Sequence, residues 1–173
     1  MKIDGEENYN GLPNIGDEIY GESIYTRRWE VLGKYQLPFE EQLMFSFSFN
    51  NHSQNSVYGD VSYLADQRIG FTQLTWDKSL GRHSILAGSA LRYNYYDDST
   101  PATSDLNGNK PDEVIIPSIF LQDEIAFNKK NSLLLGARYD YDDRHGSIFT
   151  PRGAYRFKFT DTDILRLNAG TGF

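Results

Sequence analysis

The stretch LLLGARYDYDD at residues 133–143 alternates apolar and polar side chains almost one by one. Its odd positions from 133 to 141 are leucine, leucine, alanine, tyrosine and tyrosine, and its even positions from 136 onward are glycine, arginine, aspartate and aspartate. Successive side chains of a β-strand point to opposite faces of a sheet. The stretch therefore predicts a strand with one apolar face and one charged face.

The same period of two recurs along the chain, for example in LMFSFSFN at 43–50 and AYRFKF at 154–159. Segments of this kind are typical of strands that bury one face in an apolar environment. We therefore predict an all-β, antiparallel protein. About eight strands are expected, at residues 22–37, 42–52, 67–77, 84–97, 117–128, 132–143, 150–160 and 163–172.

The connections between these strands fall into two alternating kinds. Short turns are expected at residues 38–42, 77–83, 128–131 and 161–163, and longer polar loops at 52–66, 98–116 and 143–149. Short turns on one side and long loops on the other are typical of a transmembrane β-barrel, in which the long loops face outward. This pattern predicts a transmembrane barrel segment.

Aromatic residues on the apolar face lie at both ends of the strands, with aliphatic residues between them. Bilayer interfaces favour this arrangement, because an aromatic ring prefers hydrocarbon and a hydroxyl prefers water. Residues beside the short turns are Trp76, Phe127 and Phe159, and those beside the long loops are Tyr93, Tyr95, Tyr139 and Tyr141. The alternative is a soluble antiparallel sandwich or small ligand-binding barrel, whose apolar face would be enclosed.

Composition excludes several other classes. The chain has 173 residues, with 17 Lys+Arg against 24 Asp+Glu, so its net charge of -7 opposes generic binding to nucleic acid or to anionic lipid headgroups. Without cysteine, there is neither a disulfide framework nor a thiolate metal site. No apolar stretch approaches the roughly 18 residues that a transmembrane helix needs.

Four stretches in this order and spacing resemble the TonB-dependent receptors of Gram-negative outer membranes, of the colicin-receptor and siderophore or cobalamin type. They are FLQDEIAF at 120–127, LLLGARYDYDD at 133–143, TPRGAYRF at 150–157 and LRLNAGTGF at 165–173. The hairpin-like stretch at 71–98 is also similar to this family. The resemblance covers most of the chain from about residue 20.

The resemblance implies a 22-stranded barrel that holds an amino-terminal plug. Residues 1–173 are then interpreted as a partial barrel domain without the plug, and residues 1–20 as an extracellular loop. It also implies import of a scarce nutrient, as a ferric siderophore, haem or cobalamin, with outer-membrane lipid, a plug domain and the TonB complex as partners. The alternative is a self-contained eight-stranded outer-membrane protein with a structural or adhesive role.

Charged residues of the polar face are expected to line the lumen, because a charge facing lipid at mid-depth is unfavourable by several kcal/mol. Arg138 could meet Glu124 or Arg152 on neighbouring strands, or an acidic group of a plug. The predicted lumen residues are Arg92, Gln122, Glu124, Arg138, Asp140, Arg152 and Arg156.

Residues at the long-loop ends of two strands would be the first to touch an incoming ligand. They are Tyr95, Tyr96, Asp97, Asp98 and His145. Outer-membrane proteases place acidic and histidine side chains at a barrel rim, but solvated loop charges explain such residues better, so we expect no catalytic residue and no enzyme.

The loop TSDLNGNKPDE at 103–113 spaces oxygen ligands around a glycine, as calcium loops do. Its candidate ligands for Ca²⁺ are Asp105, Asn107, Asn109 and Asp112. The closing carboxylates come early for the helix-flanked calcium loop, and Pro111 interrupts the pattern, so a flexible polar turn is the alternative. No other cofactor is expected.

Overall fold

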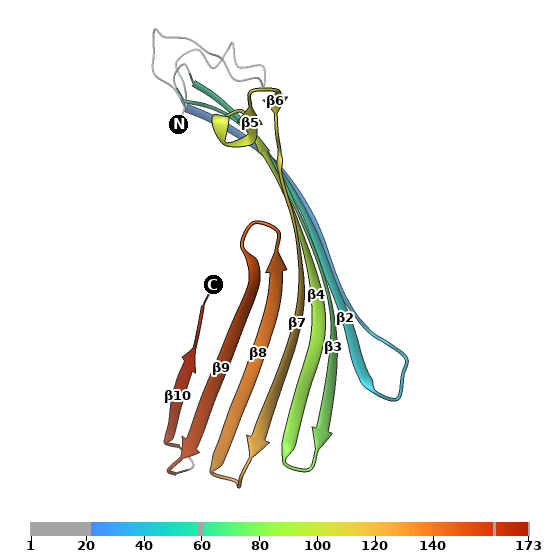
Figure 1. The fold of residues 1–173 in the computed structure, drawn as a ribbon, viewed down its shortest axis with the longest axis vertical. Helices are drawn as coiled ribbons and strands as arrows, with labels where there is room; N and C mark the ends of the chain where they lie inside the picture. The colour runs from blue at the N-terminus through green and yellow to red at the C-terminus, as the bar shows by residue number, and fades with distance from the viewer. Residues whose placement is uncertain (1–21, 59–60, 161, 173) are drawn as a thin grey trace. The chain divides into compact units, whose positions relative to one another are not determined.

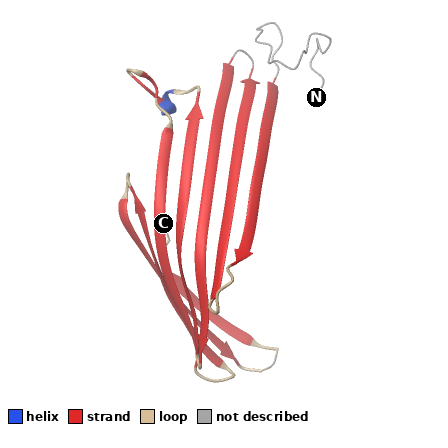
Figure 2. Ribbon diagram, turned by 90° about the vertical axis from the view of Figure 1, so that its right-hand side faces the viewer, coloured by secondary structure: helices blue, strands red, loops and turns tan. Residues whose placement is uncertain are grey.

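The computed structural model describes residues 22–58, 61–160 and 162–172, and nearly all of them lie in antiparallel strands (Figures 1 and 2). The eight long strands are β1 (Glu22–Gln36), β2 (Gln42–Tyr58), β3 (Val61–Leu80), β4 (His83–Asp98), β7 (Asp112–Ala126), β8 (Asn131–Asp142), β9 (Gly146–Lys158) and β10 (Ile164–Gly170). Between β4 and β7 lie a single 3₁₀ turn, η2 (Pro101–Thr103), and two short strands, β5 (Ser104–Asp105) and β6 (Gly108–Asn109). In this part of the chain, no helix has the length and apolar character to cross a membrane.

The long strands form one sheet in the order β1-β2-β3-β4-β7-β8-β9-β10, which follows the order of the chain (Figure 1). The predicted eight strands are confirmed. β1 and β10 stand at the two ends of this order, and β5 and β6 form a separate two-stranded sheet. The predicted extracellular loop at 1–20 lies outside the described residues.

The predicted long loops at 52–66 and 143–149 are wrong. β2 continues to Tyr58 and β3 starts at Val61, so strands occupy most of the first loop. β9 starts at Gly146, whose positive φ of 75° closes a tight turn after β8. At the end of β2, residues 51–56 are polar on both faces, so the alternating pattern gave no signal for that extension.

The chain divides into two compact units, and the long strands β1 to β4 and β7 contribute to both. Unit 1 consists of Met1–Val31, Phe49–Gly70 and Tyr93–Glu113, and unit 2 of Leu32–Ser48, Phe71–Arg92 and Val114–Phe173. Unit 2 contains the short turns that link β1 to β2, β3 to β4, β7 to β8 and β9 to β10. Unit 1 contains the connection between β4 and β7.

The strand register in unit 2 separates the side chains into two faces. Gln122 pairs with Gly136, and Gly136 pairs with Arg152, so even-numbered residues of β7, β8 and β9 share one face. We call this the polar face, and it bears Ser118, Gln122, Glu124, Arg138, Asp140, Arg152 and Arg156. The opposite, apolar face bears Ile119, Leu121, Leu133, Leu135, Tyr139, Tyr155, Phe157, Leu165 and Leu167. The predicted segregation of charged from apolar residues is confirmed here, with Asp123 as a charged exception on the apolar face.

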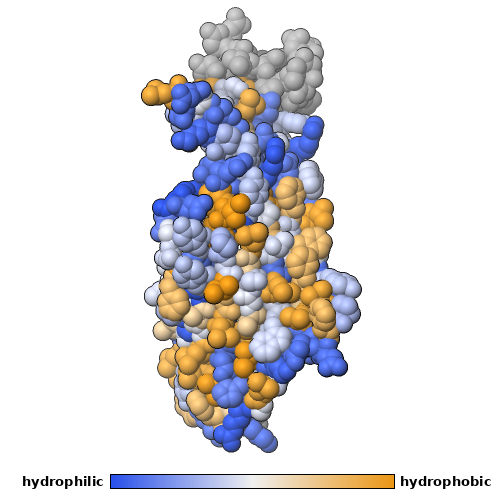
Figure 3. Space-filling model, turned by 45° about the vertical axis from the view of Figure 1, so that its right-hand side comes forward, coloured by the Kyte–Doolittle hydropathy of each residue, from blue (hydrophilic) through white to orange (hydrophobic). Residues whose placement is uncertain are grey.

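The apolar face is exposed rather than enclosed. Ile119 is 62% exposed and Leu167 57%, whereas only Val57, Ala90 and Val114 are buried among the hydrophobic residues described. Figure 3 shows apolar side chains at the surface over the strands above the short turns. A soluble sandwich would place these side chains in a core between two sheets. The single-layer arrangement instead matches a wall whose apolar side contacts lipid.

Candidate functional site

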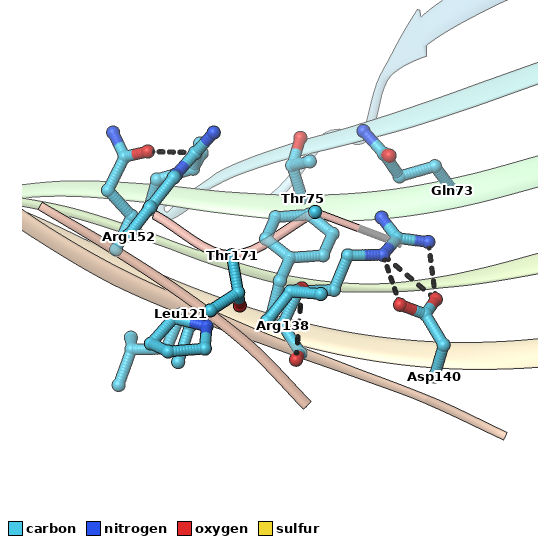
Figure 4. Close-up of a pocket in the computed structure, with 14 residues that line it drawn as sticks. Gln73, Thr75, Leu121, Arg138, Asp140, Arg152 and Thr171 are labelled. Atoms are coloured by element: carbon cyan, nitrogen blue, oxygen red, sulfur yellow. Dashed lines mark hydrogen bonds and ion pairs between the residues drawn. The ribbon is translucent and has the colours of Figure 1, made fainter. Parts of the chain in front are cut away.

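A hydrogen-bonded ion pair lies on the polar face of unit 2 (Figure 4). Arg138 Nε donates to both carboxylate oxygens of Asp140, at 2.8 and 2.9 Å. Arg138 Nη2 donates to Ser118 Oγ at 2.8 Å, and the Ser118 hydroxyl in turn donates to Asp140. Asp140 is only 8% exposed, so its charge depends on these partners. Arg138 therefore pairs with a residue of its own strand, not with the expected Glu124 or Arg152.

A second polar pair lies on neighbouring strands of the same face. Arg152 on β9 donates to the side-chain oxygen of Gln122 on β7, across Gly136 on β8. A Cβ added to Gly136 would lie 3.2 Å from Arg152 Nε, so a glycine at this position leaves room for the guanidinium to cross β8. The two pairs thus link the side chains of three adjacent strands.

The two pairs border an open pocket of about 510 Å³, shown in Figure 4. Gln73 and Thr75 of β3 also line it, together with the ring of Phe120. Of the seven predicted lumen residues, the structure places four at this pocket: Gln122, Arg138, Asp140 and Arg152. Polar donors and acceptors adjoin an apolar ring here, as in many binding surfaces.

The other three predicted lumen residues lie on the same face outside the pocket. Glu124 and Arg156 share it through the register of β7, β8 and β9. A Cβ added to Gly88 would meet the ring of Phe120, which pairs with Arg138 on the polar face, so Gly88 also lies on that face. Arg92 is four residues after Gly88 in β4 and therefore shares the polar face. Their position on one face is established, and their position in a lumen stays a prediction.

The end of β4 in unit 1 holds a chain of hydroxyl and carboxylate groups. The hydroxyl oxygens of Tyr63 and Tyr96 lie 2.7 Å apart, and Tyr96 donates to Asp98 at 3.0 Å. Asp98 also accepts the hydroxyl and the backbone N–H of Thr100, at 2.8 and 2.9 Å, and the hydroxyl of Thr103. The hydrogen bonds from Thr100 hold the pKa of Asp98 below its usual range.

Tyr95 and Asp97 have different partners in unit 1. The guanidinium carbon of Arg68 lies 4.8 Å from the centre of the Tyr95 ring, which is a cation–π geometry. The Tyr95 hydroxyl donates to Asp97 at 3.4 Å, and Asn109 donates to the same carboxylate oxygen at 3.0 Å. The structure therefore brings the four candidate residues of β4 into two polar clusters.

The fifth candidate ligand-contacting residue, His145, belongs to unit 2. Its Nδ1 lies 3.4 Å from Asp142, which is almost fully buried and accepts the Arg144 backbone N–H at 2.8 Å. This hydrogen bond lowers the pKa of Asp142. The arrangement is that of an aspartate-stabilised turn between β8 and β9. A ligand contact by His145 stays a prediction.

Two of the four predicted calcium ligands, Asp105 and Asn109, already have side-chain partners in the protein. Asp105 accepts the backbone N–H of Asn107 at 2.7 Å and pairs with Lys110 at 3.7 Å. Asn109 donates to Asp97, and Asp112 is the first residue of β7. Within residues 22–58, 61–160 and 162–172, no group of three or more histidine or carboxylate side chains is placed to hold a metal ion. The calcium site remains an untested prediction.

Two polar clusters near the short turns were not predicted. Glu41 accepts the indole N–H of Trp76 at 2.9 Å and forms an ion pair with Lys78. His83 Nδ1 lies 2.6 Å from Asp123 Oδ2, between the first residue of β4 and a residue of the apolar face of β7. Spacing along the chain carried no signal for these pairs, because their partners are 35 to 40 residues apart.

A comparison with protein-family models matches residues 6–173 to the TonB dependent receptor-like β-barrel. A comparison with curated proteins gave no match. The family match spans nearly the whole chain and agrees with the antiparallel strands and two-faced sheet described above. The chain therefore belongs to the TonB-dependent receptor-like β-barrel family, as a β-barrel segment.

Proposed function

We propose that this segment forms part of the wall of an outer-membrane importer for a scarce metal chelate, such as a ferric siderophore, haem or cobalamin. The family is one of TonB-dependent transporters, and the match over residues 6–173 supports transport as the general role. The plug domain and the TonB complex would act through other parts of the receptor. The expected location is the outer membrane of a Gram-negative bacterium.

The two faces of unit 2 are the observation that carries this proposal. One face exposes leucine, isoleucine and tyrosine side chains, and the other bears arginine, aspartate and glutamine. Lipid can cover the first face, because its hydrocarbon offers no hydrogen-bond partners and the apolar side chains of that face need none. The second face suits a polar lumen that a plug and a solute can occupy.

Contact with the solute is proposed for the β4 end in unit 1, through Tyr95, Tyr96, Asp97 and Asp98. Aromatic rings and carboxylates can together recognise a planar or chelated ligand by stacking and hydrogen bonding. The hydrogen bonds from Tyr63, Thr100 and Thr103 hold Tyr96 and Asp98 in fixed positions before a ligand arrives. Such preorganisation reduces the entropy lost on binding.

A transport assay tests this function in a strain that lacks the receptor gene and carries it on a plasmid. The probes are a ferric hydroxamate, a ferric catecholate, haemin and cyanocobalamin, each with and without an uncoupler of the proton gradient. Uncoupler-sensitive uptake of one probe is expected. Tyr96→Ala should weaken binding of that probe about tenfold, whereas Tyr25→Ala, which removes an exposed tyrosine of β1, is the matched control. Uptake of none of the probes, or uptake without a gradient, would contradict the proposal.

The alternative of a self-contained eight-stranded barrel requires a hydrogen-bonded ladder between the first and last strands. In the described part of the chain, β1 and β10 stand at opposite ends of the strand order, and no such ladder occurs. The order therefore favours a segment of a larger wall over a closed small barrel.

A further inference from the structure

Two neighbouring turns of unit 2 carry three cations. The turn from β3 to β4 contains Gly81 and Arg82, and the turn from β7 to β8 contains Lys129 and Lys130. β4 and β7 are neighbours in the sheet, and the Ala126 N–H donates to the Arg82 carbonyl at 2.8 Å. The two turns therefore lie side by side. We refer to Arg82, Lys129 and Lys130 as the basic turn pair.

The backbone of each turn is stabilised without help from these cationic side chains. Gly81 adopts a φ of 61°, which a two-residue hairpin turn requires. Asn128 Oδ1 accepts the backbone N–H groups of Lys130 and Asn131, at 2.8 and 3.0 Å. All three cations are exposed, and none of them joins an ion pair found in the described residues.

Two acidic groups near the basic turn pair already have side-chain partners. Asp123 lies three residues before the end of β7 and pairs with His83 at 2.6 Å. In the turn between β1 and β2, Glu41 pairs with Lys78. The turn residues 81–82 and 127–130 carry three exposed cations and no carboxylate, although the chain as a whole has a net charge of -7. Such a surface attracts anions.

Apolar side chains adjoin the cations. Leu80 is the last residue of β3 and is 50% exposed, and Phe127 follows β7 and is 46% exposed. Because residues two apart in a strand share a face, Leu80 lies on the same face of β3 as Trp76 and Lys78. Phe127 continues the row of Leu121 and Ile125 on the apolar face of β7. A surface with cations beyond an apolar band matches an amphiphile with an anionic head and hydrocarbon chains.

We infer that the basic turn pair binds an anionic phospholipid of the leaflet that borders the short turns. Arg82, Lys129 and Lys130 would hold the phosphate, and Leu80 and Phe127 would contact the acyl chains. An acidic protein partner would need the cations but not the neighbouring apolar side chains. This inference rests on the proposed membrane role of the chain.

A photo-crosslinker placed within the site tests the inference in the whole receptor. Leu80→p-benzoylphenylalanine is introduced, and the receptor is reconstituted in phosphatidylcholine vesicles with a minor share of phosphatidylglycerol. After illumination, mass spectrometry measures the share of phosphatidylglycerol among the crosslinked lipids. We expect this share to exceed its share in the bilayer roughly threefold or more at low salt, and to fall as salt rises.

Two further variants separate the site from general charge effects. Lys129→Gln with Lys130→Gln should return the crosslinked share to that of the bilayer. Arg27→Gln with Lys110→Gln removes two exposed cations elsewhere and should leave the enrichment unchanged. Correct folding of each variant is checked by the shift in gel mobility between heated and unheated samples.

The outcomes distinguish this inference from the proposed function. Crosslinking to both lipids in the bilayer ratio would overturn the lipid site and leave the membrane role intact. No crosslinking to either lipid, with a folded receptor, would contradict the membrane role itself. Crosslinking mainly to a protein added as an acidic partner would also overturn the lipid site.

Discussion

The two faces of the β7–β8–β9 sheet share one backbone but are stabilised in different ways. On the polar face, Arg138, Asp140 and Ser118 satisfy one another through hydrogen bonds. On the apolar face, Ile119, Leu135 and Leu167 expose hydrocarbon side chains that cannot form hydrogen bonds, so an apolar environment for them must come from outside the chain. The difference shows that an alternating sequence can encode two surroundings at once, one internal to the protein and one supplied by the bilayer.

The largest expected effect comes from a charge placed on either face of one strand. Leu134 and Leu135 are adjacent residues of β8, but Leu134 lies on the polar face and Leu135 on the apolar face. Leu135→Arg should destabilise the folded receptor in vesicles by about 2–4 kcal/mol, because the charge faces hydrocarbon and its cross-strand neighbour Asp123 already pairs with His83. Leu134→Arg is the matched control and should have a much smaller effect. Urea unfolding in vesicles measures both, and equal effects would contradict the assignment of faces.

The next effect concerns space on the polar face. A Cβ at Gly88 would overlap the Leu74 carbonyl oxygen and lie 2.5 Å from the Phe120 ring. Gly88→Ala should therefore destabilise by about 1–3 kcal/mol, since backbone must move. Gly153→Ala is the control, because its Cβ would meet only ordinary contacts at 3.7 and 3.8 Å. If the Gly88→Ala and Gly153→Ala variants unfold at the same urea concentration, the backbone around Gly88 can move to accept a Cβ at little cost.

A smaller effect should follow when the ion pair of the polar face is broken. Arg138→Ala leaves the carboxylate of Asp140 nearly buried without its cation. We expect a loss of about 1–2 kcal/mol, reduced by the partial exposure of Arg138. The double variant Arg138→Ala with Asp140→Ala should be less destabilised than Arg138→Ala alone. A double-mutant cycle that gives no coupling between the two residues would show that the pair does not stabilise this face.

The smallest effect is expected beyond the membrane, where water can reach both faces of a strand. The pKa of Asp98 is lowered, first by its hydrogen bond from the Thr100 side chain. A lowered pKa in the folded state gives stability that is present above the ordinary value of 3.8 and is lost as the pH falls through the folded value. Protease resistance of the 98–112 connection should therefore fall in acid below that range.

Thr100→Val separates this effect from general acid unfolding. The substitution removes the hydroxyl donor and should raise the pKa of Asp98 toward its ordinary value. Protection would then be lost at a higher pH than in the unmodified chain. Thr72→Val, on an exposed position of β3, is the control and should leave the pH profile unchanged. Identical profiles for Thr100→Val and the unmodified chain would contradict the role of Asp98.

Alternation predicted the strands well where one side of the sheet is apolar. β8 and β4 begin and end within one residue of the predicted bounds. The pattern failed at 52–58, where polar residues follow one another but the strand continues. Here Ser53 donates to Asp66 at 2.5 Å and Ser56 is fully buried, so hydrogen bonds and packing maintain the strand without an apolar face. A period-two pattern appears only where one face of a strand contacts apolar surroundings and the other contacts polar surroundings. It disappears where both faces are polar.

The pairs that build the polar face were harder to predict than the face itself. The sequence indicated that Arg138, Asp140 and Arg152 share one face, but their partners depend on the register between strands. Ser118 lies opposite Asp140 only because β7 and β8 pair in that register. The length of the turn at 127–130, which Asn128 closes, fixes that register and is not readable from alternation.

Because the order of the strands in the eight-stranded sheet is their order in the chain, each ladder joins two long strands that follow one another, and β5 and β6 intervene only between β4 and β7. Such a topology has a low contact order for a β-protein, so each hairpin can join the previous one without closing a large loop. The same property matters for evolution. A hairpin can be duplicated, inserted or lost between two others without rethreading the chain, which lets walls of this kind change in circumference one hairpin at a time.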